Sequence, residues 1–453
     1  MTFDVCILGA GPGGTRAALE AASCGLSVAL LERGPVGGTC LNWGCVPTKL
    51  LLGATAAQPL LEAQHKLKGA TGEIRFDLPA IQQRKDRFIK GTRQALEKQL
   101  KQAGIELVTG TATVTAPGTV NVETAEGPRT ITCTHLVVAT GSSPAAFPGL
   151  APDADCVLDS TALLELTEAP ESLLIVGGGA IGLEMGDFYA RLGTRIIMVE
   201  GMDRLAPTEE PEVGDTLRKV FKKEGWDIHT GRKVASLATV DGKALLRFED
   251  GTELTATKAL MAVGRRPSTA GLGLEAAGAT LRGPGWVITD DNLQAAPGVY
   301  AIGDVNGRTL LAHAADHQAR YVIARIAGKT DAPYGAPVMP ACIYGHTEAM
   351  RAGATVAALK SAGESVQVST AQLISNPIIQ GYGNTAGCVK VLWVDGKVRG
   401  VTAVGHGVSH LITQSTIIVT QGWQRKDVHS IIFAHPTLDE ALEMALLAPV
   451  QDA

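Results

Sequence analysis

One pattern occurs twice in this chain of 453 residues: DVCILGAGPGGTRAALEAASCGLSVALLE at residues 4–32 and SLLIVGGGAIGLEMGDFYARLGTRIIMVE at residues 172–200. In each copy an apolar run leads into a G-x-G-x-x-G turn, a helix-like stretch and a β-branched run that ends in glutamate. The first motif glycine and this glutamate are 23 positions apart in both copies. The spacing predicts two strand–turn–helix–strand units that each bind a dinucleotide.

Each residue type in the pattern has a physical task. The first glycine makes the tight turn, the second leaves room for a pyrophosphate, and the third lets helix and strand pack closely. The helix N-terminus offers N–H groups to the phosphates, and the final acid accepts hydrogen bonds from ribose hydroxyls. These residues are Gly9, Gly11, Gly14 and Glu32 in the first copy and Gly177, Gly179, Gly182 and Glu200 in the second. Two sites imply two nucleotides, one a flavin and the other a nicotinamide.

The acid of the second copy favours NAD over NADP. Glu200 would repel a 2′-phosphate, and no arginine pair follows it, because Gly201, Met202 and Asp203 come next. Arg204 is close enough to leave NADP open as the alternative.

Length and composition narrow the class of protein. A chain of 453 residues predicts two or three domains, and 45% hydrophobic with 19% charged residues is ordinary for a globular protein. The net charge of −5 gives no reason to expect a nucleic-acid partner. No apolar stretch reaches the roughly 20 residues that span a bilayer. The first strand-like run begins almost at Met1, so no targeting segment is expected, and we expect a cytoplasmic protein without a membrane partner.

Two of the eight cysteines stand apart from the others. Cys40 and Cys45 lie in GGTCLNWGCVPTK, residues 37–49. In a reducing cytosol such a pair is expected to be catalytic or metal-binding rather than a structural disulfide. A regular helix would rise ~7.5 Å between them, too far for an unstrained disulfide, so a bond needs a distorted turn, for which Gly44 supplies the freedom. If the segment begins a helix, its dipole would lower a thiol pKa.

The other cysteines and the metal alternative carry less weight. The six remaining cysteines, scattered among apolar or small residues, are expected to be buried small hydrophobes. Metal ligation by the pair is the weaker alternative, because no second Cys/His pair lies at zinc spacing, and no metal site is expected. The six are Cys6, Cys24, Cys133, Cys156, Cys342 and Cys388.

Elsewhere helical and strand-like segments alternate. Residues 78–102 show helical periodicity with charged side chains, Lys85 among them, on the expected outer face. Strands are expected at 105–108, 119–123, 130–140, 367–374 and 387–394, and Pro/Gly-rich junctions at 143–149, 265–273 and 333–340. We expect a separate α+β domain after the last junction.

Five motifs together resemble the pyridine nucleotide–disulfide oxidoreductases, and within that family the dihydrolipoamide dehydrogenases. The resemblance covers essentially the whole chain, and its most specific parts are the cysteine segment and the His-Pro-Thr run. The motifs are the cysteine segment, ATGSSP at 139–144, VGRRP at 263–267, VYAIGDV at 299–305 and AHPTLDE at 434–440.

The resemblance implies an α/β fold of the glutathione-reductase type, with two Rossmann-like domains and a C-terminal α+β dimerisation domain. The FAD-binding domain would comprise 1–145 and 264–333, the NAD-binding domain 146–263, and the dimerisation domain 334–453. The implied FAD residues beyond the turn are Gly38, Thr39, Lys49, Thr140, Gly141, Asp304 and Ala312. Of these, Asp304 would contact the ribityl chain of the flavin. The implied further NAD residues are Ile181, Glu184 and Gly264.

The family's catalytic residues can be carried over position by position. Cys45 would lie against the flavin and Cys40 would face the substrate. His435, oriented by Glu440, would act as acid–base from the other subunit of a homodimer, because a dithiol attacks a disulfide only as thiolate. Lys49 and Glu184 match the family's buried ion pair beside the reactive flavin ring.

Three features depart from the family pattern. Phe433 stands where a second histidine is usual two positions before His435. The run Thr-x-Pro-Glu is replaced by Gly345, His346, Thr347 and Glu348. The chain between Glu32 and Gly37 is also short, so the interface and the substrate channel are expected to differ from those of typical members.

The leading hypothesis is oxidation of protein-bound dihydrolipoamide by NAD. Its partner would be a lipoyl-bearing carrier protein of a 2-oxoacid dehydrogenase or glycine cleavage complex. The nearest alternative is an NAD(P)H-dependent reductase of another disulfide, such as glutathione, or of a metal ion. Glu200 disfavours glutathione reductase, and the absence of a cysteine pair in residues 447–453 disfavours mercuric reductase. The intact cysteine pair argues against soluble transhydrogenases and against a non-catalytic docking subunit.

Overall fold

The computed structural model describes residues 2–453, which form two compact units. The first unit runs to residue 48 and continues with 83–145 and 264–335, and the second comprises 49–82, 146–263 and 336–453. The expected division into flavin, nicotinamide and dimerisation domains stays a prediction. Within residues 2–453, no helix combines the length and the apolar character needed to cross a membrane.

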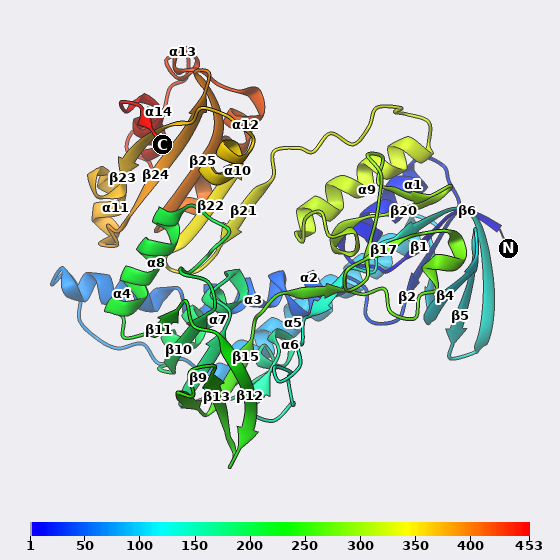
Figure 1. Cartoon of the computed structure of the whole chain (residues 1–453), viewed down its shortest axis with the longest axis horizontal. Coiled ribbons are helices and arrows are strands. Elements are labelled where there is room, and N and C mark those ends of the chain that lie inside the picture. Colours follow the sequence, from blue (N-terminus) through cyan, green and yellow to red (C-terminus); the bar gives the residue numbers. More distant parts are fainter. Residues whose placement is uncertain (1) are drawn as a thin grey trace. The chain divides into compact units, whose positions relative to one another are not determined.

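The first unit is built on a largely parallel sheet (Figure 1). Its strand order is β19-β20-β6-β1-β2-β3, with β4 and β5 attached as antiparallel strands through β6. The buried parts of β1 and β2, residues 5–8 and 28–31, are wholly apolar, as expected for parallel strands that are covered on both faces. The strands are β1 (Thr2–Leu8), β2 (Val28–Glu32), β3 (Glu106–Thr109), β4 (Thr111–Ala116), β5 (Thr119–Thr124), β6 (Gly127–Val138), β19 (Gln294–Ala296) and β20 (Val299–Ala301).

Helices and short hairpins complete this unit. Helix α1 (Pro12–Ser23) packs against α9 (Ala312–Ile326), and Ala17, Ala18 and Ala319 are fully buried. The cysteine segment forms α2 (Gly38–Trp43) and the start of α3 (Cys45–Thr55). The small pairs are β7 (Ser142–Pro144) with β16 (Arg265–Pro267) and β17 (Leu281–Arg282) with β18 (Trp286–Val287).

The second unit contains one parallel sheet and two antiparallel sheets. The parallel sheet has the order β11-β10-β9-β15-β8 and carries helix α7 (Ala180–Arg191) after β9, which repeats the β1–α1 arrangement of the first unit. Helix α8 (Pro211–Lys223) starts at a proline and ends in lysines, as helix termini prefer. The strands are β8 (Val157–Leu158), β9 (Ser172–Val176), β10 (Arg195–Glu200), β11 (Asp227–Thr230) and β15 (Lys258–Met261), beside the sheet of β12 (Val234–Val240), β13 (Lys243–Phe248) and β14 (Glu253–Ala256).

The C-terminal part of the second unit is an antiparallel sheet of order β21-β22-β25-β24-β23-β26, drawn yellow to red in Figure 1. Helices cover it, and α14 packs on β23 and β24. This is the expected α+β region. The elements are β21 (Pro340–Ile343), β22 (Glu348–Gly353), β23 (Gln367–Gln372), β24 (Gly387–Val394), β25 (Lys397–Gly405), β26 (Gln451–Asp452), α10 (Val356–Ser361), α11 (Pro377–Tyr382), α12 (Ile412–Gln421), α13 (Arg425–Val428) and α14 (Asp439–Leu447). The remaining helices of the chain are α4 (Ala57–Lys66), α5 (Leu78–Gln102) and α6 (Ser160–Leu163).

Two sequence expectations need correction. Lys85 of α5 is not on an outer face, because its side chain is 1% exposed. A long aliphatic stem can follow apolar surface into an interior, and a charge at a helical position does not by itself show which side faces water. Cys24 and Cys342, expected to be buried, are half-buried, whereas the other four scattered cysteines are buried.

Candidate redox site and nucleotide-binding turns

The two G-x-G-x-x-G turns have the same backbone geometry. Gly9 has φ +97° and Gly177 has φ +118°, a region that L side chains rarely adopt. A Cβ atom on Gly14 would lie 1.8 Å from the carbonyl oxygen of Gly9, and one on Gly182 would lie 2.0 Å from that of Gly177. Only glycine fits these positions, because helix and strand are in backbone contact.

The acids of the two copies also make matching contacts. Glu32 accepts the amides of Ala10 through Oε2, at 2.7 Å, and of Gly34 through Oε1, at 2.8 Å. Glu200 accepts the amide of Gly178 at 2.7 Å and that of Met202 at 2.7 Å. Each carboxylate thus closes its own turn. A carboxylate has about four acceptor sites, so the ribose contact predicted for each acid stays chemically possible.

The residues present fit two dinucleotides. Helices α1 and α7 begin after Gly11 and Gly179, and neither N-terminus is capped by a side chain, so its amides are available to phosphates. A Cβ atom on Gly179 would meet no atom within 4 Å, which leaves open space at the second turn. Among residues 2–453, Thr140 is one of the few with a buried side-chain oxygen that has no hydrogen-bond partner, as expected of a group that faces a ligand.

The cysteine segment is held against the first turn. Gly38 has φ +57°, and a Cβ atom there would lie 2.6 Å from Cα of Gly11. Asn42 is buried and donates to the carbonyl oxygens of Val36, at 3.1 Å, and Gly38, at 2.9 Å, while its own oxygen accepts from Arg93 at 2.7 Å. Asn42 and Arg93, which the sequence did not single out, therefore fix the loop that carries the thiols.

The two thiols lie on either side of a break in the helix. Cys40 is half-buried in α2, Cys45 is exposed and is the first residue of α3, and Gly44 interrupts the helix with φ −144° and ψ −110°. This is the distorted turn that the spacing requires, although the disulfide itself stays a prediction. The N-terminus of α3 carries partial positive charge, which favours a thiolate at Cys45.

Asp304 is held by residues of two other quoted motifs. It lies in a short 3₁₀ helix after β20, and its Oδ2 accepts from Oγ of Ser142 at 2.5 Å. Arg265 donates to the same Oγ at 2.6 Å, and its Nε lies 3.7 Å from Asp304. The sequence missed both partners, although each lies in a motif that had been noticed, ATGSSP or VGRRP. The other predicted FAD residues of this unit lie in α2 (Gly38, Thr39), in the loop between β6 and β7 (Thr140, Gly141) and at the start of α9 (Ala312).

The predicted ion pair forms within the second unit. Lys49 Nζ lies 2.6 Å from Oε2 of Glu184, and Oε1 of Glu184 accepts the amide of Tyr344 at 3.0 Å. The ammonium also lies 4.6 Å above the centre of the Tyr344 ring. Burial raises the pKa of the Glu184 carboxyl, and the charge of Lys49 opposes this rise. Of the other NAD residues, Ile181 lies in α7, whereas Gly264 belongs to the first unit.

His435 and Glu440 are also in contact. Nδ1 of His435 lies 2.8 Å from Oε1 of Glu440, whose Oε2 accepts the amide of Thr437 at 2.9 Å. The bond from His435, followed by that from Thr437, lowers the pKa of Glu440. The His435 side chain is 76% exposed, so its second ring nitrogen is accessible.

One cavity of about 460 Å³ lies within the second unit. Its wall includes Lys49 and Tyr344 of the ion-pair region, together with Arg191, His346 and Tyr382. From the sequence, His346 stands out only as a departure from the family pattern, and no motif points to Arg191.

The chain belongs to the pyridine nucleotide-disulphide oxidoreductase family. The family's model matches residues 3–319, and its dimerisation domain matches residues 339–446. The protein is thus an oxidoreductase and a flavoprotein with a dimerisation domain, and its cofactors are FAD and NAD(H).

Relatives and solved structures match over nearly the full length. The chain is 35% identical to a dihydrolipoyl dehydrogenase of Chlorobaculum tepidum, covering 99% of this chain and 97% of the relative. It is 34% identical to the mitochondrial dihydrolipoyl dehydrogenase 1 of Arabidopsis thaliana, covering 98% and 90%. LpdA of Mycobacterium tuberculosis superposes with a TM-score of 0.90 at 25% identity, covering 98% of both chains. The HOCl-induced flavoprotein disulfide reductase RclA of Escherichia coli gives 0.88 at 25% identity, covering 98% and 99%.

Proposed function

We propose that this protein is a dihydrolipoamide dehydrogenase that oxidises protein-bound dihydrolipoamide with NAD through the Cys40–Cys45 pair. The observation that carries the proposal is the position of the cysteine segment, which lies on the first dinucleotide turn through Gly38 and Gly11. Full-length similarity to dihydrolipoyl dehydrogenases supports this substrate.

The exchange of sulfur bonds follows from the residues. A substrate thiolate attacks Sγ of Cys40, the Cys40–Cys45 bond breaks, and Cys45 leaves as a thiolate. The second substrate thiolate then attacks the sulfur that is bonded to Cys40, which closes the cyclic disulfide of lipoamide and releases Cys40 as a thiol. The substrate loses two electrons and two protons, and the cysteine pair gains the two electrons.

His435 would move the protons of this exchange. Because its Nδ1 is bonded to Oε1 of Glu440, the neutral ring carries the hydrogen on Nδ1 and leaves Nε2 as the base. A positioned imidazole of this kind takes the proton of one attacking thiol and returns it to Cys40, and it holds the proton of the other thiol until that proton passes to water. We place His435 in the site of the partner subunit of a homodimer, as in the family, and its high exposure in a single chain supports this arrangement.

The nucleotide turns would hold the two cofactors. When bound, FAD would supply a two-electron acceptor for the reduced cysteine pair and a hydride donor for NAD. Gly11, Thr140 and Asp304 would contact FAD, Gly179 and Glu200 would contact NAD, and the Lys49–Glu184 pair would lie beside the reactive ring. The domains predicted from the sequence, including FAD-binding segments 1–145 and 264–333, are part of this proposal.

A reductase of another disulfide is the second candidate, because RclA is a structural neighbour. The distinguishing experiment compares turnover with NAD(H) and NADP(H), using lipoamide and glutathione disulfide as substrates. We expect NAD-dependent turnover of dihydrolipoamide at least about tenfold faster than any other combination. Preference for glutathione disulfide with NADPH would reject the proposal. The lipoyl carrier partner is tested by turnover of an isolated lipoyl domain.

A further inference from the structure

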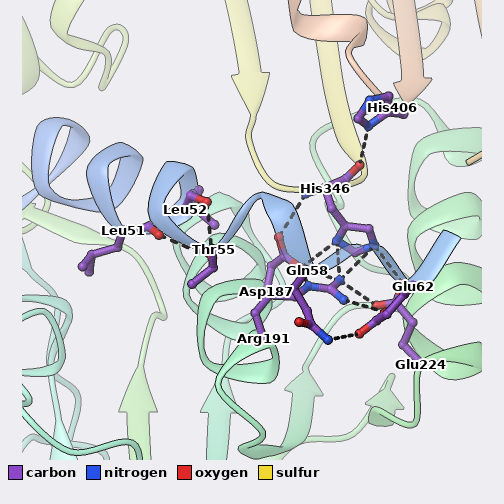
Figure 2. Close-up of polar contacts among 10 residues, drawn as sticks. All are labelled: Leu51, Leu52, Thr55, Gln58, Glu62, Asp187, Arg191, Glu224, His346 and His406. Atoms are coloured by element: carbon purple, nitrogen blue, oxygen red, sulfur yellow. Dashed lines mark hydrogen bonds and ion pairs between the residues drawn. The ribbon is translucent and has the colours of Figure 1, made fainter. Parts of the chain in front are cut away.

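A buried network of charged side chains lies in the second unit (Figure 2). Asp187 and Arg191 come from α7, Glu224 ends α8, and His346 follows β21. Nδ1 of His346 lies 2.6 Å from Asp187, and its Nε2 lies 2.8 Å from Glu224. Arg191 also bonds both acids, at 2.9 Å and 3.0 Å. No step of the proposed reaction uses these residues.

The two acids of the network favour the protonated form of the His346 ring. Both ring nitrogens face carboxylate oxygens, and only the protonated ring can donate to both acids. Nη2 of Arg191 also lies 2.6 Å from Nδ1 and 3.1 Å from Nε2, and its positive charge opposes protonation. Burial alone would lower the pKa of His346, but Asp187 and Glu224 outweigh it and raise this pKa to about 9. Arg191 opposes the rise, while Glu62, 3.4 Å from Arg191, adds a third acid. His406 approaches from another element, with its Nδ1 3.5 Å from the carbonyl oxygen of His346.

The same loop that carries His346 also holds Glu184. Helix α7 places Glu184 and Asp187 three residues apart and so on one face. The amide of Tyr344 donates to Glu184 at 3.0 Å, and the amide of His346 donates to Oδ2 of Asp187 at 3.0 Å. Two anchors, at the amides of residues 344 and 346, therefore bind this loop to the helix.

Gly345 lies between these two anchors and explains one departure from the family pattern. Its φ is +147°, and a Cβ atom would lie 2.9 Å from Oδ2 of Asp187. A threonine could not take this conformation with Asp187 in its place. The position of Asp187 thus requires glycine at residue 345 and is itself fixed by the amide of His346.

We propose that Asp187 and His346 are positioning residues for the Lys49–Glu184 ion pair, because they fix the loop whose backbone orients the Glu184 carboxylate. The place of that pair beside the flavin rests on the proposed function. The Glu184 side chain is 7% exposed, so the loss of the Tyr344 amide would leave a buried oxygen without its donor. Lys49 is 37% exposed and would then turn to water.

The test uses the FAD-loaded enzyme and the variant Asp187→Asn, with two measurements. One is the visible absorption spectrum of the oxidised flavin, which reports charge beside the ring. The other is the single-turnover rate of flavin reduction by NADH. We expect a shifted spectrum and a rate about tenfold lower, the fold-change that one charged hydrogen bond represents. Gly345→Ala, which displaces Oδ2 without removing a charge, should shift both in the same direction.

Glu210→Gln is the matched control. Glu210 is a buried acid of the same unit that also binds one ammonium, Lys390 at 2.8 Å, and one backbone amide, Val356 at 2.7 Å. The Glu210→Gln variant should have a lower thermal unfolding midpoint but the same flavin spectrum and the same reduction rate as the wild type. If Asp187→Asn and Gly345→Ala fold but, like this control, leave the spectrum and the rate unchanged, the positioning role is wrong.

A double variant separates positioning from general damage. In a Glu184→Gln background, Asp187→Asn should change neither spectrum nor rate further, because Asp187 acts through Glu184. Additive losses would overturn the proposal. Reduction by NADH involves no dithiol, so an enzyme that fails with lipoamide but passes this test would reject only the proposed substrate.

Discussion

Gly38 touches Gly11 so closely that a Cβ atom on Gly38 would lie 2.6 Å from the Cα atom of Gly11. This contact joins the first G-x-G-x-x-G turn and the segment that carries Cys40 and Cys45 into one backbone surface. The distance from the proposed FAD site to the cysteines would depend on it.

Gly38→Ala should therefore weaken FAD binding. At φ +57° a Cβ atom costs roughly 1 kcal/mol even without the overlap, so we expect the free energy of unfolding to fall by more than about 2 kcal/mol. FAD content per purified chain and urea unfolding measure the effect. Gly91→Ala is the control, because Gly91 lies within α5 and its Cβ would meet no atom within 4 Å. Equal FAD content in both variants would contradict the argument.

Cys45→Ser should lower dihydrolipoamide turnover by at least about a thousandfold, because a serine oxygen can neither form nor receive the exchanged bond. The variant should still bind FAD, and NADH should still bleach the flavin. It should also lack the long-wavelength absorbance that a thiolate beside oxidised flavin produces. Cys24→Ser, at a half-buried thiol elsewhere, should retain full turnover. Full activity of Cys45→Ser would reject the mechanism.

His435→Gln should lower dithiol oxidation by about 10²–10³-fold, the range of a lost general base. Glu440→Gln should cost less, because the base remains but loses the carboxylate that orients it at 2.8 Å. The Glu440→Gln substitution should also change the pH profile of turnover. His429→Gln, at an exposed histidine nearby in the sequence, serves as the control. A loss in Glu440→Gln without any change in the profile would contradict an orienting role.

The raised pKa of His346 predicts a stability that falls at alkaline pH. The pKa of His346 is raised from 6.5 to about 9, so the folded state keeps a proton that the unfolded chain releases between these values. Its contribution, roughly 3 kcal/mol, is full below pH 6.5 and is lost as pH rises through 9. Urea unfolding of the wild type and His346→Gln from pH 6 to 9.5 should show a converging difference in free energy. A constant difference would show that the ring is not protonated.

Glu200→Gln should relax the preference for NAD. Removal of the negative charge lowers the repulsion of a 2′-phosphate, so KM for NADPH should fall by about tenfold. The amide oxygen can still accept a backbone N–H, which keeps the turn closed. The ratio of kcat/KM for the two nucleotides measures the change, and an unchanged ratio would show that another residue selects the cofactor.

The sequence predicted the features that local chemistry determines. The glycine turns, helix α5 at residues 78–102 and the strands near 106, 119 and 127 follow from backbone sterics and periodicity. Lys49 and Glu184 are 135 positions apart and were paired only through the family resemblance. The contact of Asp187 with His346 spans 159 positions and was missed, because only tertiary structure brings a loop onto a helix face. Lys85 was misplaced for the same reason.

The hydrogen bonds that the amides of Ala10 and Gly178 donate to Glu32 and Glu200 also bear on how the proposed cofactors would bind. Each acid fixes its own G-x-G-x-x-G turn through bonds within the protein, so the shape of the turn does not depend on a bound nucleotide. A nucleotide that enters a preorganised turn loses little affinity to the ordering of loops. The rate of cofactor exchange should accordingly depend on the desolvation and the contacts of the nucleotide itself, and not on a rearrangement of the two turns.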